Sequence, residues 1–149
     1  MTAPPGDAET IVVRRRIAAS REEVFDAWTD ATGMQLWMCP DDIVSAVVHL
    51  DVRVGGSLRV VMHGATGAYE HWGEFTTIDR PRKLAFTWCA RATDFVSTLV
   101  TVELFEAPDG HCDLVLTHEK FRRPDASEQY RGGWSQIITR LESFLRHRR

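Results

Sequence analysis

The pattern of hydrophobic and polar positions changes twice along the chain. A helical pattern follows Ser20, alternation with a period of two residues fills the middle, and a helical pattern returns near the C-terminus. Turn-like residues separate the alternating segments, and such short connections favour antiparallel neighbours. The sequence therefore predicts seven antiparallel strands, over residues 11–17, 44–54, 57–63, 69–78, 83–89, 95–105 and 112–119.

Ser20 begins the first predicted helix. Ser20 and Glu23 have the spacing of a capping box, in which each side chain accepts a hydrogen bond from the backbone of the other residue. The apolar residues that follow recur at helical spacing. We expect Thr32-Gly33 to end this helix, and residues 34–38 to form one further helical turn before Pro40.

A long helix is predicted at the end of the chain. Its apolar residues share one face, and they are Trp134, Ile137, Ile138, Leu141, Phe144 and Leu145. Burying that face is worth roughly 9–18 kcal/mol before opposing costs, so the helix should be integral to the fold. Asp125 or Ser127 is a candidate N-cap. Gly132-Gly133 either delays the regular helix to Trp134 or permits close approach of another element.

Together these elements predict an α+β fold. The apolar face of a seven-stranded antiparallel sheet must be covered, and the long helix is the element large enough to cover it. We expect a curved sheet wrapped around the C-terminal helix, with one or two short helices after the first strand. Residues 1–10 are expected to form a disordered tail, and residues 11–149 a single domain.

Composition and charge narrow the class of protein. The chain has 149 residues, 44% hydrophobic and 26% charged, with a net charge of −3, which is typical of a globular domain and not of a nucleic-acid-binding protein. No apolar run reaches membrane-spanning length, and the N-terminus lacks the apolar core of a signal peptide. Cys39, Cys89 and Cys112 are widely spaced, which favours reduced thiols and a cytoplasmic location.

Alternation within the strands assigns one face of the sheet to the interior. In residues 112–119 the even positions are apolar except for His118, so that face should point inward. The same reasoning points the following residues inward: Leu58, Val60, Met62, Leu84, Phe86, Trp88, Val100, Val102 and Leu104. The long helix would face them across an apolar cavity with a few polar groups, as in many ligand sites. A filled core is the alternative.

Candidate cavity residues follow from these faces. They are Trp37, Met62, Tyr69, His71, Phe86, Trp88, Val100, Leu116, His118, Trp134, Ile138 and Leu141. An inward His118 needs either a structural hydrogen-bond partner or a ligand. Tyr69 and His71 are expected to face inward with Phe75, and Trp37 to lie in a loop near the mouth. No catalytic motif, metal-ligand spacing or cofactor-binding glycine pattern is present.

Six segments of the sequence, taken in order, resemble one family. They are IAASREEVFDAWTD (17–30), DVRVGG (51–56), GEF (73–75), LAFTW (84–88), LTHE (116–119) and GW (133–134). The resemblance is to the activator-of-heat-shock-protein-90-ATPase homologue family, C-terminal-domain type, of the START-like (SRPBCC) superfamily. It covers residues 11–145 and implies a helix-grip fold. The chain departs from the family at two places. Members often carry two adjacent tryptophans where this chain has Trp37-Met38, and Pro-Pro where it has Arg80-Pro81.

The resemblance implies a binding protein more readily than an enzyme. We interpret the chain as a non-catalytic protein that binds a small apolar or amphipathic molecule between sheet and helix, oriented by His118 and by Tyr69 or His71. One alternative is a co-chaperone-like domain that binds a chaperone or another protein. Another is a cyclase-like enzyme, in which His118 would act as acid or base. No nucleic acid, membrane, metal or cofactor is expected, and the chain is expected to be a monomer or homodimer.

Overall fold

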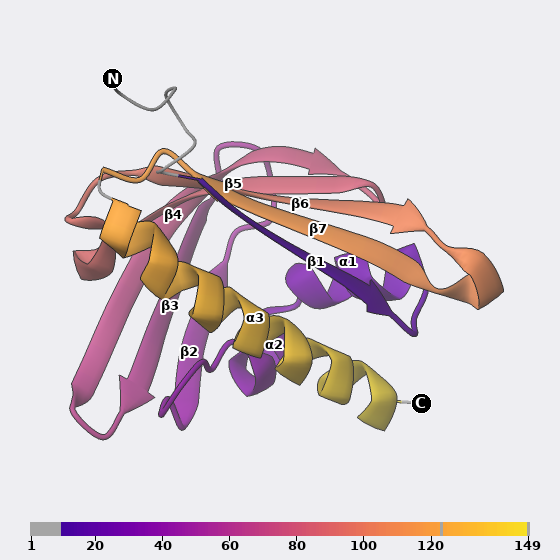
Figure 1. Cartoon of the computed structure of the whole chain (residues 1–149), viewed down its shortest axis with the longest axis horizontal. Helices are drawn as coiled ribbons and strands as arrows, with labels where there is room; N and C mark the ends of the chain where they lie inside the picture. The colour runs from indigo at the N-terminus through magenta and orange to yellow at the C-terminus, as the bar shows by residue number, and fades with distance from the viewer. Residues whose placement is uncertain (1–9, 123, 149) are drawn as a thin grey trace.

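A curved antiparallel sheet wraps around a long helix (Figure 1). The computed structural model describes residues 10–122 and 124–148, and within them seven strands form one sheet. The strands are β1 (Ile11–Ile17), β2 (Ser45–Leu50), β3 (Ser57–Gly64), β4 (Gly67–Asp79), β5 (Lys83–Ala90), β6 (Thr98–Glu106) and β7 (Cys112–Glu119). Their order is β1-β7-β6-β5-β4-β3-β2, and all neighbours are antiparallel. This is the predicted α+β helix-grip fold.

Three helices lie on the concave side of this sheet, α1 (Arg21–Trp28), α2 (Ala31–Trp37) and α3 (Pro124–His147), in the part of the chain that the structure describes. Short 3-10 turns occur at Arg91–Thr93 and Pro108–Gly110. The core fills the space between the helices and the sheet. The inward faces predicted from alternation are confirmed: the even positions of β7 are all buried, and so are the predicted positions of β3, β5 and β6.

The start of α1 confirms the capping box. The Ser20 hydroxyl accepts a hydrogen bond from the Glu23 amide at 3.1 Å, and the Glu23 carboxylate accepts one from the Ser20 amide at 3.2 Å. The predicted end of this helix was wrong. It ends at Trp28, because the next residue, Thr29, has a non-helical backbone conformation and is the C-cap. The second helix, α2, begins at Ala31 and contains Gly33.

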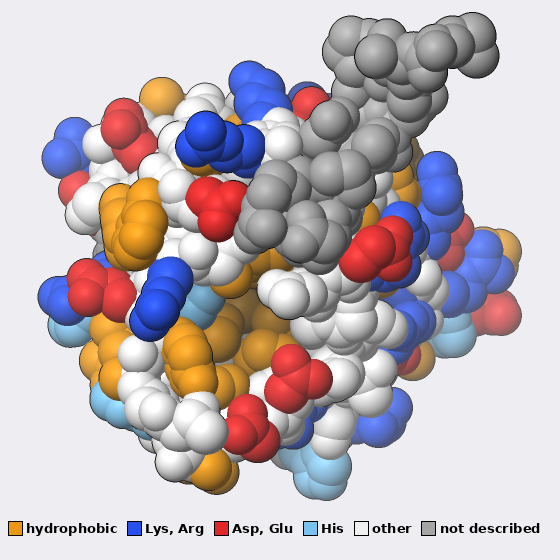
Figure 2. All heavy atoms as spheres, turned by 60° about the vertical axis from the view of Figure 1, so that its left-hand side comes forward, with side chains coloured by type: hydrophobic (Ala, Val, Ile, Leu, Met, Phe, Trp, Pro, Cys, Tyr) orange, Lys and Arg blue, Asp and Glu red, His pale blue; other side chains and the backbone are white. Residues whose placement is uncertain are grey.

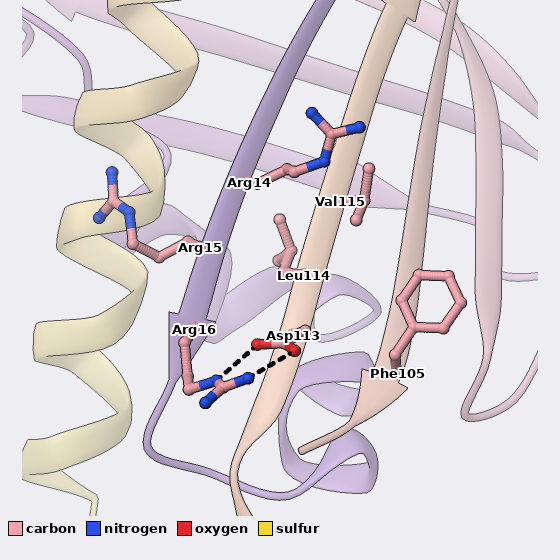
Figure 3. Close-up of a pocket in the computed structure, with 7 residues that line it drawn as sticks. All are labelled: Arg14, Arg15, Arg16, Phe105, Asp113, Leu114 and Val115. Atoms are coloured by element: carbon pink, nitrogen blue, oxygen red, sulfur yellow. Dashed lines mark hydrogen bonds and ion pairs between the residues drawn. The ribbon is translucent and has the colours of Figure 1, made fainter. Parts of the chain in front are cut away.

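Arg15 fastens α3 to the edge strand β1. Its guanidinium donates hydrogen bonds to Glu142 at 2.6 Å, to the Thr139 hydroxyl at 3.0 Å and to the Ser135 hydroxyl at 3.2 Å. Figure 3 shows Arg15 pointing toward the helix, while Arg16, on the opposite face of β1, pairs with Asp113 of β7. Arg15 and Arg16 therefore serve opposite faces of β1.

Two predicted strands are shorter than expected. The strand expected over 44–54 ends at Leu50, because the chain turns back through Gly55, which has a φ of +86°. The strand expected over 95–105 begins only at Thr98. The preceding segment is a turn held by the buried Thr93 hydroxyl, whose single proton is shared between the carbonyls of Ala90 and Val96, at 2.9 and 2.8 Å. A side chain that satisfies the backbone in this way competes with strand pairing.

The last helix begins earlier than its apolar face indicated. α3 starts at Pro124, a residue type favoured in the first helical turn, and runs through Gly132-Gly133 without interruption. Neither Asp125 nor Ser127 is the N-cap, because both lie inside the helix. The residue before Pro124 is outside the described residues, as are residues 1–9, on which the expected tail falls.

Candidate functional site

Most of the space between α3 and the sheet is filled with side chains. Phe86, Val100, Leu116, Ile138 and Leu141 were predicted to line a cavity, and all five are buried in one core cluster. The rings of Trp88 and Trp134 pack against each other with centroids 5.5 Å apart. A small opening remains where the part of α3 from Tyr130 to Ile137 faces β3, β4 and β5.

That opening is a small cavity of about 60 Å³, enough for more than one water molecule. Four of the predicted site residues line it, together with four that were not predicted. The lining residues are Pro40, Met62, His71, Trp88, Tyr130, Gly133, Trp134 and Ile137. Two outer openings of about 180 and 280 Å³ also reach Pro40 and His71. Figure 2 shows this side of the molecule hollowed, with hydrophobic side chains on the floor and acidic side chains beside the hollow.

Two buried hydrogen-bonding groups at this cavity lack a partner with normal hydrogen-bond geometry. They are the Trp88 indole N–H and the Tyr130 hydroxyl. Burial raises the pKa of Tyr130 to about 12, while a weak hydrogen-bonding contact from the Trp88 indole N–H acts in the opposite direction. The hydroxyl is therefore neutral and protonated at physiological pH. The two groups are close neighbours whose contact falls short of a full hydrogen bond. Unpaired buried polar groups are rare in native proteins and call for a specific explanation.

His71 adds a hydrogen-bond acceptor to the same cavity. Its ring stacks on Trp88 with centroids 4.9 Å apart, and its Nδ1 lies 3.2 Å from the Val60 carbonyl oxygen. A carbonyl only accepts, so Nδ1 carries the proton and Nε2 of the neutral ring is an acceptor. Burial lowers the pKa of His71, and the backbone carbonyls of Val60 and Tyr69 partly oppose that effect. The ring is therefore neutral at pH 7.

His118 lies in the core behind this cavity, with both ring nitrogens engaged. Its Nδ1 accepts from the Trp134 indole N–H at 2.9 Å, so Nε2 carries the proton and donates to the Thr98 hydroxyl at 2.7 Å. The Thr98 hydroxyl in turn donates to the Trp88 carbonyl at 2.5 Å. Burial lowers the pKa of His118 to about 3. His118 therefore holds Trp134 and β5 in place as a neutral, fully bonded group.

Two predicted site residues lie elsewhere than expected. Trp37 is not in a loop at the mouth: it is the last residue of α2, fully buried, and its ring meets that of Trp28 edge-on at 4.9 Å. Tyr69 is opposite Met62 in register and lines the wider outer opening with His71, but it lies at the rim and is 43% exposed, so it is not part of the inner cavity. His71 and Phe75 do face inward as predicted.

The site residues that sequence reasoning missed are chiefly on α3. Tyr130 lies four residues before Trp134 and Ile137 three residues after it, so both continue the apolar face of the helix. Extending that face by one turn toward the N-terminus would have found Tyr130. Pro40 and Gly133 carry no such signal, because they line the cavity through the approach of two distant segments: a Cβ on Gly133 would lie 3.9 Å from Pro40.

A larger opening of about 440 Å³ lies on the outer face of the sheet (Figure 3). Arg14, Arg16, Asp113, Phe105 and Val115 are among its lining residues. Arg16 is already paired with Asp113 through two hydrogen bonds of 2.8 and 3.0 Å. None of the unpartnered buried atoms found in the described part of the chain belongs to this opening, so the inner cavity is the better candidate site.

The described residues carry neither a metal site nor a membrane span. Within residues 10–122 and 124–148, no three His, Cys, Asp or Glu side chains are grouped so that they could hold a metal ion. In the same residues, no helix combines the length and the apolar character needed to cross a membrane.

Solved structures with this fold are numerous and share little sequence with the chain. A protein from Nitrosomonas europaea is 19% identical with a TM-score of 0.81, and the match covers 95% of this chain and 97% of that one. A Rhodobacter sphaeroides protein is 21% identical with a TM-score of 0.81, covering 97% and 96%. A Plasmodium falciparum protein described as an HSP90 activator is 24% identical with a TM-score of 0.72, covering 92% and 96%.

The sequence itself matches one family model over almost its whole length. No curated protein matches the chain. The model for "Activator of Hsp90 ATPase homolog 1-like protein" matches residues 18–146, a range that contains α1, the sheet from β2 onward and nearly all of α3. The chain therefore belongs to the Activator of Hsp90 ATPase homolog 1-like protein family.

Proposed function

We propose that this protein binds a small apolar or amphipathic molecule at the cavity between α3 and strands β3 to β5. The observation that carries the proposal is a pair of neighbouring buried groups without a full hydrogen bond, the Trp88 indole N–H and the Tyr130 hydroxyl, whose residues line one cavity. Arg21, Trp28 and Trp37 each carry one such atom, but none of these residues lines this cavity. Each such group costs about 1–3 kcal/mol when it lacks a partner. A ligand that supplies the missing hydrogen bonds would recover that free energy.

The inner cavity would hold the head group of such a ligand, and the outer openings would hold the rest of it. The inner space of about 60 Å³ suits a head group of a few atoms. The openings of about 180 and 280 Å³ share Pro40 and His71 with it, so an apolar body would extend between α3 and the segment around Pro40. The family and fold are compatible with ligand binding.

The state of His118 favours binding over acid–base catalysis. An acid–base residue needs a pKa near the working pH and an atom free to reach the substrate. His118 has a pKa of about 3, and both ring nitrogens already form hydrogen bonds to Trp134 and Thr98. The histidine therefore supports the architecture of the site and does not fit the role that a cyclase-like enzyme would assign to it.

Filling the mouth of the cavity should abolish binding. Gly133→Leu places a side chain toward Pro40, whereas Gly132→Leu places the same side chain where nothing lies within 4 Å. Both substitutions remove a glycine from a helix, so both should leave α3 intact or strengthen it. We expect 1-aminoanthracene, whose fluorescence rises in an apolar site, to bind the unmodified protein and Gly132→Leu at one saturable site. Gly133→Leu should bind it at least about tenfold more weakly, since the added side chain occupies the entrance.

The titration has two clear negative outcomes. Equal binding by Gly133→Leu and Gly132→Leu would place the probe elsewhere and contradict the proposed site. Absence of saturable binding in the unmodified protein would contradict the proposed function. Far-ultraviolet circular dichroism of the three proteins checks that α3 is retained in each.

A chaperone-related role is the second candidate, and an exposed aromatic pair favours it. The rings of Trp72 and Phe95 stack with centroids 6.2 Å apart, and Phe95 is 64% exposed. Phe95 also has a φ of +57°, a conformation that bulky residues rarely adopt without a constraint. The Plasmodium falciparum protein of the same fold is described as an HSP90 activator. An aromatic pair held at the surface is a typical centre for a protein contact.

Removing this aromatic pair should weaken chaperone binding if that role is correct. We expect the double variant Trp72→Ser, Phe95→Ser to bind an Hsp90-type chaperone at least about tenfold more weakly, by biolayer interferometry, because it loses both aromatic anchors. Leu36→Ser removes an apolar side chain of similar exposure on α2 and should leave binding unchanged. No binding by the unmodified protein, or equal losses in both variants, would rule this role out at the aromatic pair.

A further inference from the structure

The inner cavity contains no charged group, and this restricts the ligands that it can take. Its lining is apolar except for Trp88, Tyr130, Trp134 and His71, and the Trp134 N–H is already bonded to His118. Tyr130 and His71 are neutral, for the reasons given above. A charged head group placed there would lose its hydration without gaining a counter-ion, which is strongly unfavourable.

The outer openings strengthen the discrimination against anions. Asp41 lines both outer openings, and Asp42 lines the wider one. Asp41 is held in place by Gln136 of α3, whose side-chain amide donates to the Asp41 carboxylate at 3.0 Å and accepts from the Asp41 backbone N–H at 2.5 Å. An anion approaching the cavity would therefore pass a fixed negative charge, and no described lysine or arginine lines any of these three openings.

The free hydrogen-bonding atoms define what the head group must offer. The Trp88 indole N–H is a donor only, and its neighbour is the Tyr130 hydroxyl, so the Tyr130 O–H is left to donate to the ligand, which must accept from it. His71 Nε2 is an acceptor, because Nδ1 donates to the Val60 carbonyl, so the ligand must donate to it. The complementary group is one that both accepts and donates a hydrogen bond while remaining neutral.

We propose that the cavity selects a neutral head group that both donates and accepts hydrogen bonds, a hydroxyl or an amide, and excludes carboxylates and groups that only accept. This inference rests on the proposed function and adds the chemical class of the ligand. The head group lies between Trp88, Tyr130 and His71, and the apolar remainder extends past Pro40 and Gly133. A phenol is the smallest probe that combines such a hydroxyl with an apolar body.

Three probes of nearly equal size test this selection. 4-Propylphenol donates and accepts, 4-propylanisole only accepts, and 4-propylbenzoate is an anion at pH 7.5. Binding is followed in ¹H–¹⁵N NMR spectra by the indole N–H signals of the five tryptophans, with the Trp88 signal assigned by Trp88→Phe. We expect the phenol to shift the Trp88 signal at saturation. The anisole and the benzoate should each bind at least about tenfold more weakly.

A variant isolates the acceptor that distinguishes the phenol from the anisole. His71→Phe keeps an aromatic ring against Trp88 and removes Nε2, so phenol affinity should fall to that of the anisole, whose own affinity should not change. His49→Phe, the same substitution at an exposed histidine of β2, is the matched control and should leave the preference for phenol unchanged. If His71→Phe does not fold, the three-probe comparison on the unmodified protein decides the question.

The outcomes separate this inference from the function on which it rests. Equal affinity for phenol and anisole, or tighter binding of the benzoate, would overturn the selection and leave ligand binding intact. Binding of 1-aminoanthracene without binding of any of the three probes would do the same. If neither 1-aminoanthracene nor any of the three binds, both proposals fail together.

Discussion

Gly73→Ala should destabilise the protein by about 3 kcal/mol or more, at the upper end of what an added methyl group costs in a packed interior. A Cβ on Gly73 would lie 1.8 Å from the carbonyl oxygen of Thr87 and 2.7 Å from the carbonyl carbon. Both atoms belong to the backbone of β5, so no rotation of a side chain can relieve the overlap. β4 and β5 would have to separate between the pairs Trp72–Cys89 and Phe75–Phe86.

The matched control for this substitution is another glycine-to-alanine change. Gly132 lies in α3 with nothing within 4 Å of a built Cβ, so Gly132→Ala should stabilise the protein by about 0.4–1 kcal/mol. Urea unfolding followed by tryptophan fluorescence measures both variants. A Gly73→Ala variant with an unchanged unfolding midpoint would show that β4 and β5 do not approach this closely.

Acidification should remove a large part of the stability through His118. Burial lowers the pKa of the folded-state ring to about 3, whereas an unfolded chain has a histidine pKa near 6.5. Between these values the unfolded state binds a proton that the folded state does not, so the free energy of unfolding falls as pH decreases. The contribution is complete above pH 6.5 and is lost toward pH 3, with a total of about 4–5 kcal/mol and a slope of up to about 1.4 kcal/mol per pH unit.

His118 is not the only group that makes the protein sensitive to acid. Burial also lowers the pKa of His71, and ion pairs with arginine lower the pKa values of Asp26, Asp79 and Asp113. The test is therefore the difference in slope between the unmodified protein and His118→Leu, from urea unfolding at several pH values between 6 and 4. The unmodified protein should show the steeper slope.

A direct measurement on the ring supports the same conclusion without a variant. Long-range ¹H–¹⁵N NMR spectra distinguish neutral histidine tautomers, and His118 should remain neutral with its proton on Nε2 at pH 5. A ring that titrates near pH 6.5 would contradict the buried, doubly bonded state described here.

The sheet was largely predictable from the sequence, because the residues of a strand alternate between its two faces and only one face can be the buried one. Once Leu114 and Leu116 are assigned to the buried face of β7, every second residue of the strand must lie on that face too, which is how His118 was placed correctly. The turns were predictable for a similar reason: Gly64 and Gly67 flank a two-residue connection in register between β3 and β4. These are local rules, and the structure follows them.

The extent of the cavity was not predictable, because it depends on how distant side chains fill space. Phe86 and Leu116 have the same inward pattern as Met62, yet only Met62 reaches the cavity. Likewise, alternation placed Tyr69 on the same face as His71, but β4 extends past the last residue paired with β5, so Tyr69 lines the outer opening at the rim and does not enter the core. The unsatisfied Tyr130 hydroxyl is a property of the assembled structure, since most buried hydroxyls find a partner nearby.

Gln35 has a consequence for the behaviour of the protein at high concentration. β2 is an edge of the sheet, and the outward amide N–H of Val48 donates to the Gln35 side-chain oxygen at 3.2 Å. The side chain occupies a position that the backbone of another strand would take. A second molecule seeking to extend the sheet at β2 must first displace it, which is one of the ways in which proteins keep open sheet edges from acting as templates for aggregation.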